Sequence, residues 1–203
     1  MTIDQIMRTA PVIPVLVLDG SLDPTALAET LVDAGLPVIE VTLRTPQALD
    51  SIRAMAGVPG AIVGAGTVLN EAQLARALDA GAQFIVSPGL TNPMALAARD
   101  TAVPFLPGVA TASDIMRGLD LGLDRFKFFP AETSGGIAAL KALAGPFGEA
   151  RFCPTGGITA DSARDWLALE PVLCVGGSWL VRSGETSLET VAERARQAAA
   201  LAG

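Results

Sequence analysis

A lysine in an apolar segment of this chain could supply a nucleophilic amine. Lys127 lies within the aromatic-rich run Arg125–Pro130, and the only other lysine among the 203 residues is Lys141. Burial among such neighbours removes water from an ammonium group and favours the neutral amine. A neutral lysine amine attacks carbonyl carbons to form a Schiff base, so this segment predicts carbonyl chemistry. The alternative is a strand lysine that reaches the rim of the fold or pairs with a carboxylate.

A glutamate and an arginine occur in another segment that alternates in the manner of a strand. Val38, Glu40, Thr42 and Arg44 share one face, and the residues between them form an apolar face. If the apolar face meets helices, Glu40 and Arg44 point into the interior, where unpaired charges are costly. This polar interior predicts a functional site. The alternative is a structural ion pair of Glu40 with Arg44 or with Lys127.

Two later segments contain glycine pairs that are suited to anion binding. They are Thr155–Gly157 and Gly176–Ser178. Glycines let backbone N–H groups approach an anion closely, and the loops after the last two strands of a parallel barrel often bind phosphate. Ser178 could add a hydroxyl donor, whereas simple tight turns are the alternative. Thr67, which ends an earlier glycine-containing run, could donate to a substrate carboxylate or cap a helix.

The elements that must position these residues alternate between strand and helix. Eight short β-type runs begin near Val12, Pro37, Ala61, Phe84, Val103, Arg125, Arg151 and Val172. Strands that alternate with helices pair in parallel through right-handed crossovers, and eight such units can close into a (β/α)8 TIM barrel. We therefore expect an α/β fold in which 1–203 form a single (β/α)8 barrel catalytic domain with a short N-terminal helix. A doubly wound open sheet is the alternative, although no dinucleotide fingerprint follows the first run.

Capping signals predict where several helices begin and end. A capping side chain stands directly before a proline at Asp23-Pro24, Thr45-Pro46 and Asn92-Pro93. Glycines that suit helix C-termini occur at Gly35, Gly57, Gly81 and Gly122.

A repeat in the chain relates the glutamate to the lysine. Glycines precede the second, fourth and sixth predicted strands, and they are Gly35, Gly81 and Gly122. The residues five positions beyond them are Glu40, Val86 and Lys127. Alternate strands of a parallel barrel supply side chains to a common interior layer, so we expect Glu40 and Lys127 at the same level.

Composition and charge exclude several classes of function. The net charge of −7 argues against binding to nucleic acid or to an anionic membrane. Histidine and tyrosine are absent from the sequence, which removes the usual imidazole catalyst and the commonest zinc ligand. Cys153 and Cys174 lack metal-type spacing and are expected to be reduced core residues.

The composition predicts an oligomer, and the amino-terminal residues predict a cytoplasmic protein. Charged residues make up 17% of the chain, below the roughly 25% usual for soluble domains, so partner subunits are expected to cover part of the surface. The first residues include no basic segment ahead of a long apolar stretch, so neither a signal peptide nor a membrane span is expected.

The chain resembles the 2-keto-3-deoxy-6-phosphogluconate aldolases, Schiff-base lyases of the (β/α)8 class, over essentially its whole length. The motifs that carry the resemblance are EVTLRT (40–45), GAGTV (64–68), SPG (87–89), FKFFPAE (126–132), CPTGGI (153–158) and VGGSWL (175–180). The resemblance implies a class I aldolase that cleaves this phosphorylated keto acid to pyruvate and glyceraldehyde 3-phosphate. It also implies cleavage of 4-hydroxy-2-oxoglutarate to pyruvate and glyoxylate, a homotrimer, and no metal or organic cofactor.

The resemblance also implies a role for individual residues. Lys127 would form the Schiff base and Glu40 would be the acid–base carboxylate. Arg44 and Thr67 would bind the pyruvate end of the substrate, and Pro88 and Phe129 would shape the pocket. The residues that would hold the phosphate end are Thr155, Gly156, Gly157, Gly177 and Ser178.

Three other functions remain open on the sequence. One is an aldolase for the galactonate epimer, although Thr42, Arg44 and Thr45 resemble the gluconate type. Another is a phosphate-binding barrel isomerase or synthase in which Lys127 acts only through its charge. The third is a barrel that binds a phosphorylated metabolite without catalysis.

Overall fold

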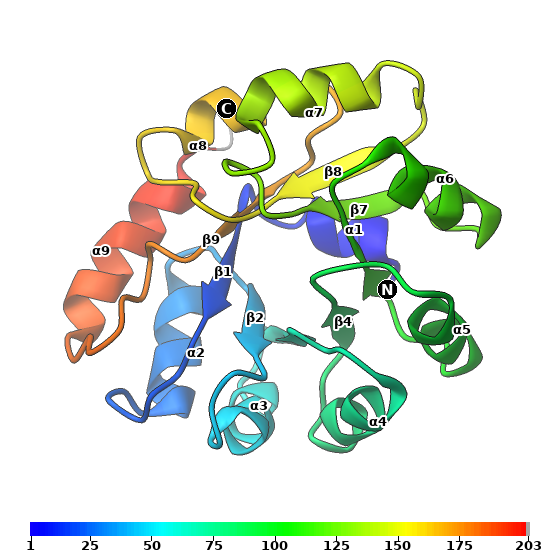
Figure 1. Ribbon diagram of the computed structural model, residues 1–203. Helices are drawn as coiled ribbons and strands as arrows, with labels where there is room; N and C mark the ends of the chain where they lie inside the picture. The colour runs from blue at the N-terminus through cyan, green and yellow to red at the C-terminus, as the bar shows by residue number, and fades with distance from the viewer. Residues whose placement is uncertain (202–203) are drawn as a thin grey trace.

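Parallel strands lie at the centre of the molecule, and helices surround them (Figure 1). The computed structural model describes residues 1–201. The strands are β1 (Val12–Leu16), β2 (Val38–Thr42), β3 (Ile62–Gly66), β4 (Phe84–Val86), β5 (Phe105–Leu106), β6 (Gly108–Val109), β7 (Arg125–Phe128), β8 (Arg151–Pro154) and β9 (Val175–Gly177). The helices are α1 (Ile3–Met7), α2 (Pro24–Asp33), α3 (Ala48–Ala56), α4 (Glu71–Asp79), α5 (Asn92–Asp100), α6 (Ala112–Asp120), α7 (Gly136–Ala144), α8 (Ala163–Leu167) and α9 (Leu188–Ala199).

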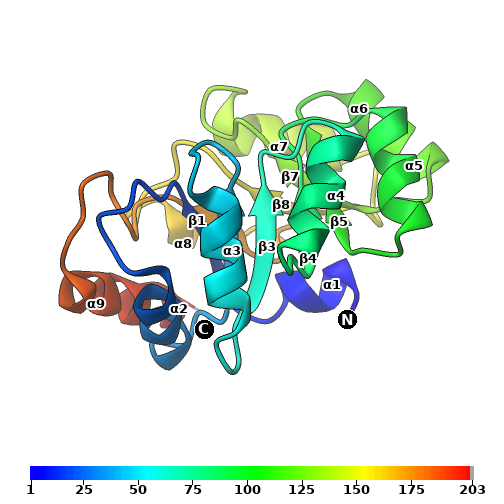
Figure 2. The ribbon, with the colours of Figure 1, turned by 90° about the horizontal axis from the view of Figure 1, so that it is seen from below.

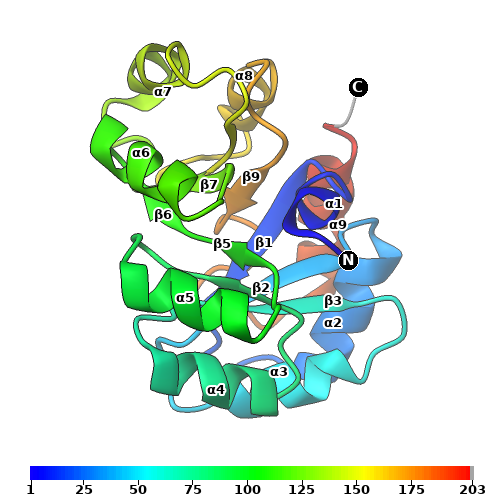
Figure 3. The ribbon, with the colours of Figure 1, turned by 90° about the vertical axis from the view of Figure 1, so that its right-hand side faces the viewer.

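The strands form two parallel sheets that curl around one interior. The larger sheet has the order β5-β4-β3-β2-β1-β9, and the smaller has the order β6-β7-β8. Single bridges pair Phe152 with Val172 and Thr155 with Gly176, and these bring the chain after β8 beside β9. Figure 3 shows α3 and α4 on one side of the strands and α7 and α8 on the opposite side. The predicted α/β fold with parallel strands is therefore confirmed.

Most of the predicted elements occur where the sequence indicates them. The short N-terminal helix is confirmed as α1, and seven of the eight predicted strands begin within two residues of the expected place or contain it. The fifth run, expected near Val103, is two short strands on either side of Pro107, which lacks the N–H group that a continuous ladder needs. The last run pairs only at Val172 before β9 begins at Val175.

The helix signals were right at some boundaries and wrong at others. Asp23 caps α2, because its Oδ1 accepts from the N–H of Ala26 at 2.9 Å. The start predicted at Thr45-Pro46 is wrong, since α3 begins at Ala48 after Gln47, which makes no side-chain cap. At the Asn92-Pro93 signal, Thr91 rather than Asn92 is the N-cap of α5.

The glycines predicted at helix ends do not all act alike. Gly35, Gly81 and Gly122 adopt the left-handed backbone that suits a helix C-terminus, with φ of 90°, 96° and 78°. Gly57 follows α3 directly with φ of −79°, so that helix ends without a left-handed turn.

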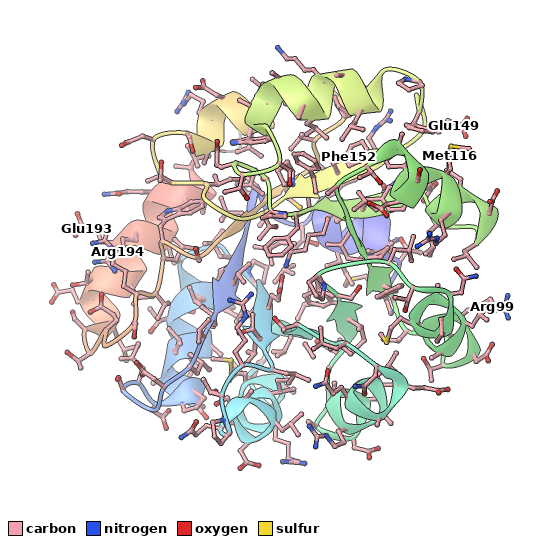
Figure 4. All side chains as sticks on the ribbon, in the orientation of Figure 1. Arg99, Met116, Glu149, Phe152, Glu193 and Arg194 are labelled. Carbon is pink, nitrogen blue, oxygen red and sulfur yellow. The ribbon has the colours of Figure 1, made fainter. Side chains whose placement is uncertain are left out.

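Two apolar clusters stabilise the fold, one between the strands and the surrounding helices and one in the interior that the strands enclose. The outer cluster lies between strands and helices and includes Ile39 and Val41, which confirms that this face of β2 meets helices. Phe126 of β7 and Phe152 of β8 belong to it, with ring centroids 6.1 Å apart, and Phe152 is labelled in Figure 4. The inner cluster includes Val38 of β2, so the opposite face of that strand points into the interior.

Helix α1 closes the inner cluster at the amino-terminal ends of the strands. Ile6 and Met7 are buried in that cluster, and Figure 2 shows α1 beside the end at which β3 begins. Arg125 of β7 anchors the helix, because its Nε lies 2.6 Å from Oδ1 of Asp4. The Arg125 guanidinium beside it lowers the pKa of the Asp4 carboxyl. Within residues 1–201, no helix combines the length and apolar character needed to cross a bilayer.

Candidate active site

The lysine and the glutamate meet in the interior. Nζ of Lys127, from β7, lies 3.1 Å from Oε1 and 3.4 Å from Oε2 of Glu40, from β2. Their side chains are only 7% and 4% exposed. The two residues are 87 positions apart in the chain, and the repeat that relates them predicted this common level. A buried ion pair of this kind gives little net stability, so it is a candidate functional site.

An aromatic ring lies next to the amine. The Phe129 ring centroid is 5.3 Å from Nζ of Lys127, within the range of a cation–π contact. Phe129 follows β7 directly and is half-buried. Its position beside the amine agrees with the pocket-shaping role that the resemblance implies.

Arg44 and Thr67 lie together at the carboxyl-terminal rim of neighbouring strands. Nε of Arg44, just after β2, donates to Oγ1 of Thr67, just after β3, at 3.2 Å. Arg44 therefore does not pair with Glu40, which answers one of the alternatives from the sequence. Thr67 has φ of 58°, a left-handed backbone that costs free energy in a β-branched residue. Arg44 remains exposed, so its guanidinium is accessible to an anion at the rim.

The loop after β4 adds a rigid turn to the same end. Pro88 is half-buried, and Ser87 before it donates from Oγ to the backbone oxygen of Gly89 at 2.6 Å. The backbone oxygen of Pro88 also lies against Gly108 of β6, where a Cβ could not be accommodated.

The predicted phosphate residues follow β8 and end β9. Thr155 is buried and pairs with Gly176 through a parallel bridge. Gly156 and Gly157 have φ of 103° and 81°, a turn that residues with side chains rarely adopt. Ser178 is exposed directly after Gly177, the last residue of β9. These residues therefore lie at the carboxyl-terminal ends of adjacent strands, as the sequence predicted.

Two residues that sequence reasoning did not assign support this turn. Glu132 donates from its N–H to the backbone oxygen of Gly156 at 3.1 Å, and its side chain occupies the space where a Cβ of Gly157 would stand. Nε1 of the fully buried Trp166, in α8, donates to Oε1 of Glu132 at 3.0 Å. Glu132 belongs to the motif FKFFPAE, but only the tertiary contact reveals what it does.

The two cysteines are part of the inner cluster. Cys153 and Cys174 are both free and buried, which confirms the prediction of reduced core residues. A hydrogen bond with Cys153, together with burial, raises the pKa of the Cys174 thiol well above its usual range. This thiol is held as a weakly reactive, protonated group. Residues 1–201 include no group of three or more acidic, cysteine or histidine side chains suited to a metal ion.

The chain is similar to proteins of one family over nearly its whole length. The family model for KDPG and KHG aldolase matches residues 3–194. The KHG/KDPG aldolase of Escherichia coli strain K12 is 56% identical over 179 residues, which are 88% of this chain and 84% of that protein.

Two solved structures extend this similarity to three dimensions. The 2-keto-3-deoxy-6-phosphogluconate aldolase of Zymomonas mobilis with 3-phosphoglycerate is 54% identical, has a TM-score of 0.96, and is matched over 98% of this chain and 95% of that one. The KDPG aldolase of Legionella pneumophila holds pyruvate as a covalent carbinolamine intermediate. It is 39% identical, has a TM-score of 0.94, and is matched over 98% of both chains. The chain belongs to the KDPG and KHG aldolase family.

Proposed function

We propose that this protein is a class I aldolase, a lyase that cleaves 2-keto-3-deoxy-6-phosphogluconate to pyruvate and glyceraldehyde 3-phosphate. The observation that carries the proposal is the buried contact of 3.1 Å between Nζ of Lys127 and Oε1 of Glu40, in a chain of the KDPG and KHG aldolase family. A nucleophile within hydrogen-bond reach of a base is the arrangement that covalent catalysis requires. The carbinolamine of pyruvate in the Legionella relative supports the same chemistry here.

Lys127 begins the reaction by attacking the C2 ketone. The amine must lose a proton before attack, and the Glu40 carboxylate is close enough to accept it. The carbinolamine hydroxyl then takes the proton back from Glu40 and leaves as water, which gives an iminium and restores the Glu40 carboxylate. The iminium draws electrons from the C3–C4 bond. The apolar surroundings of the pair, including the Phe129 ring, keep bulk water away from this intermediate.

Glu40 then serves as the base for cleavage. It removes the proton from the C4 hydroxyl while the C3–C4 bond breaks, and glyceraldehyde 3-phosphate leaves. The bond electrons remain on the pyruvate carbons as an enamine attached to Lys127. Protonation of C3 and hydrolysis of the imine release pyruvate and restore the amine.

The two ends of the substrate are held by different parts of the rim. Arg44 and Thr67 bind the carboxylate of the pyruvate end through charge-assisted and hydroxyl hydrogen bonds, with Pro88 beside them. The phosphate end binds to the backbone N–H groups and hydroxyls of 155–157 and 177–178. The Zymomonas relative was solved with 3-phosphoglycerate, a phosphorylated three-carbon acid, which is consistent with such an end.

The same residues support a second substrate. The Escherichia coli relative is named a KHG/KDPG aldolase, so we propose that this chain also cleaves 4-hydroxy-2-oxoglutarate to pyruvate and glyoxylate. This reaction needs Lys127 and Glu40 but no phosphate site. Among phosphorylated substrates we rank the gluconate form above its galactonate epimer, because Thr42, Arg44 and Thr45 resemble the gluconate type. Faster cleavage of the galactonate epimer would reverse this order.

Borohydride trapping tests the covalent step directly. Pyruvate and borohydride together should add a reduced three-carbon adduct at Lys127, identified by peptide mass spectrometry, and Lys127→Met should abolish both the adduct and cleavage. Lys141→Met is the matched control, because Lys141 lies in α7 beside a surface hollow of about 460 Å³ that includes none of the proposed site residues. Lys141→Met should keep both the adduct and cleavage activity. An adduct that persists in Lys127→Met would exclude Lys127 as the Schiff-base residue.

We also propose how the whole chain is organised. Closure of the two sheets into a single (β/α)8 barrel domain over 1–203 is supported by the bridges between the end of β8 and the β9 segment. We further propose a homotrimer in the cytoplasm. Contacts between its subunits are supported by the low charged fraction of 17% and by the exposed apolar side chains Met116 and Leu119 of α6. Figure 4 shows Met116 at the outer edge of the molecule. A solution mass of one or two chains by light scattering would overturn the trimer.

A further inference from the structure

A glycine on β3 leaves the space that the Glu40 side chain occupies. Gly66 is the last residue of β3 and pairs in register with Thr42 of β2. A Cβ built on Gly66 would overlap Oε1 of Glu40 and would lie 2.7 Å from both Cδ and Cγ of the same side chain. Real Cβ atoms essentially never come within 3.0 Å of another heavy atom in this way, so any side chain here would displace the carboxylate.

We infer that Gly66 is a positioning residue for the acid–base carboxylate. Without a Cβ on β3, the Glu40 side chain lies across that strand and reaches Nζ of Lys127 at 3.1 Å. The inference rests on the proposed function, in which Glu40 moves the protons of the reaction. Gly66 itself does not touch the substrate and acts only through Glu40.

The backbone conformation at position 66 does not require a glycine. Gly66 is absent from the residues with positive φ, so alanine could adopt its conformation. Its backbone oxygen accepts from the N–H of Leu43 at 2.8 Å, and a Cβ would leave that bond in place. The space taken by Glu40 is therefore the feature that requires a residue without a side chain.

The atoms that would have to move decide what a substitution does. All three of the nearest atoms belong to Glu40, and they form the far part of a flexible side chain. They can rotate away without a shift of the backbone, whereas the contact with Lys127 depends on their position. Substitution should therefore reduce activity much more than stability.

A second site in the interior follows the same rule. A Cβ on Gly176 of β9 would overlap Oγ1 of Thr155 and lie 2.7 Å from its Cγ2. Gly176 thus makes room for a buried hydroxyl on the neighbouring segment, as Gly66 does for a buried carboxylate. The recurrence supports a general role for strand glycines next to polar side chains in this interior.

Gly66→Ala tests the inference by kinetics. We expect kcat to fall on the order of 10²-fold, as for a catalytic group displaced by about 1 Å, with KM changed much less. The pyruvate adduct at Lys127 should still form with borohydride, because the amine remains. Gly148→Ala is the matched control, since a Cβ there meets nothing within 4 Å, and it should keep wild-type kcat. Equal kcat values for the two variants would overturn the inference.

Two further measurements separate this inference from the proposed function. A crystal structure of Gly66→Ala should show Oε1 of Glu40 more than 4 Å from Nζ of Lys127, and an unchanged distance would overturn the inference whether or not the wild type is an aldolase. Absence of aldolase turnover in the wild type would instead overturn the proposed function. If Gly66→Ala does not fold, Glu40→Ala/Gly66→Ala should fold, because the collision is gone. Failure of this double variant would assign Gly66 to the fold rather than to Glu40.

Discussion

Two glycines on β3, two positions apart, face neighbours of opposite character. A Cβ on Gly64 would overlap ring atoms of Phe84, a fully buried member of the inner apolar cluster. A Cβ on Gly66 would overlap the Glu40 carboxylate, which belongs to the polar layer with Lys127. The same absence of a side chain thus accommodates an aromatic ring at Gly64 and the proposed acid–base carboxylate at Gly66.

The two glycines of β3 should therefore affect different properties of the protein, one its stability and the other its turnover. The inner cluster is closed by Ile6 and Met7 of α1, and burial of its apolar surface stabilises the fold. The interior also contains the Glu40–Lys127 pair, whose desolvation offsets much of its attraction. Changes that disturb the inner apolar cluster should therefore act on the free energy of unfolding, and changes that disturb the ion pair should act on turnover.

Glu40→Gln should give the largest effect and should act on turnover alone. The amide cannot accept the protons that the reaction moves, so kcat should fall by about 10²–10⁴-fold, the range for loss of a general acid–base group. Steady-state cleavage assays measure this fall, and urea denaturation checks that the fold is retained. Slow imine formation should persist, detected as the borohydride adduct. Unchanged turnover would remove Glu40 from the mechanism. Gly66 would then have no role in catalysis, and its contrast with Gly64 would disappear.

The sequence allowed Glu40 and Lys127 to be placed at one level but did not reveal the glycine against which the Glu40 side chain lies. Glu40 and Lys127 occupy equivalent positions of a repeat, and the alternation in β2 indicates which face points inward. The role of Gly66 depends on the register of β3 against β2 and on the direction of one side chain, which no local pattern encodes.

Local signals failed where tertiary contacts set the backbone. Thr45-Pro46 reads as a helix start, but the chain first makes a turn in which the Arg44 N–H donates to the backbone oxygen of Thr42 at 2.8 Å. That turn carries Arg44 to Thr67, and α3 begins only at Ala48. The error therefore lies at the rim of the candidate site, where functional geometry competes with local preference.

Gly64→Ala should have the next largest effect, and it should act on stability. The Cβ collides with the Phe84 ring, which is enclosed by the inner cluster and cannot rotate away as Glu40 can. Overpacking of this kind costs about 1–3 kcal/mol of the free energy of unfolding. Urea denaturation should show a lower midpoint than in Gly148→Ala, while kcat per folded molecule stays near the wild-type value. A loss of kcat without a loss of stability would contradict the contrast between Gly64 and Gly66.

The smallest effect concerns a carboxylate at the rim, Asp19, whose ionisation changes the stability of the fold with pH. Among the described residues of the inner apolar cluster there is no such carboxylate. Asp19, in the loop after β1, accepts from the N–H of Gly184 and from the N–H of Ser21, each at 3.0 Å. The Ser21 hydroxyl, followed by these N–H groups, lowers the pKa of Asp19 from 3.8 to about 2.

A depressed pKa in the folded state means that the ionised Asp19 stabilises the fold above about pH 4 and that this contribution is lost as the pH falls toward 2. Asp19→Asn should therefore be less stable than the wild type at pH 5, by an amount that shrinks toward zero near pH 2. Ser21→Ala should show a smaller pH-dependent difference, because it removes only the hydroxyl. Urea denaturation between pH 2 and pH 5 measures all three proteins. The free energies of unfolding of the wild type and Asp19→Asn could instead differ by a constant amount over this range. That result would show that the contact between Asp19 and Gly184 does not stabilise the fold through the charge of Asp19.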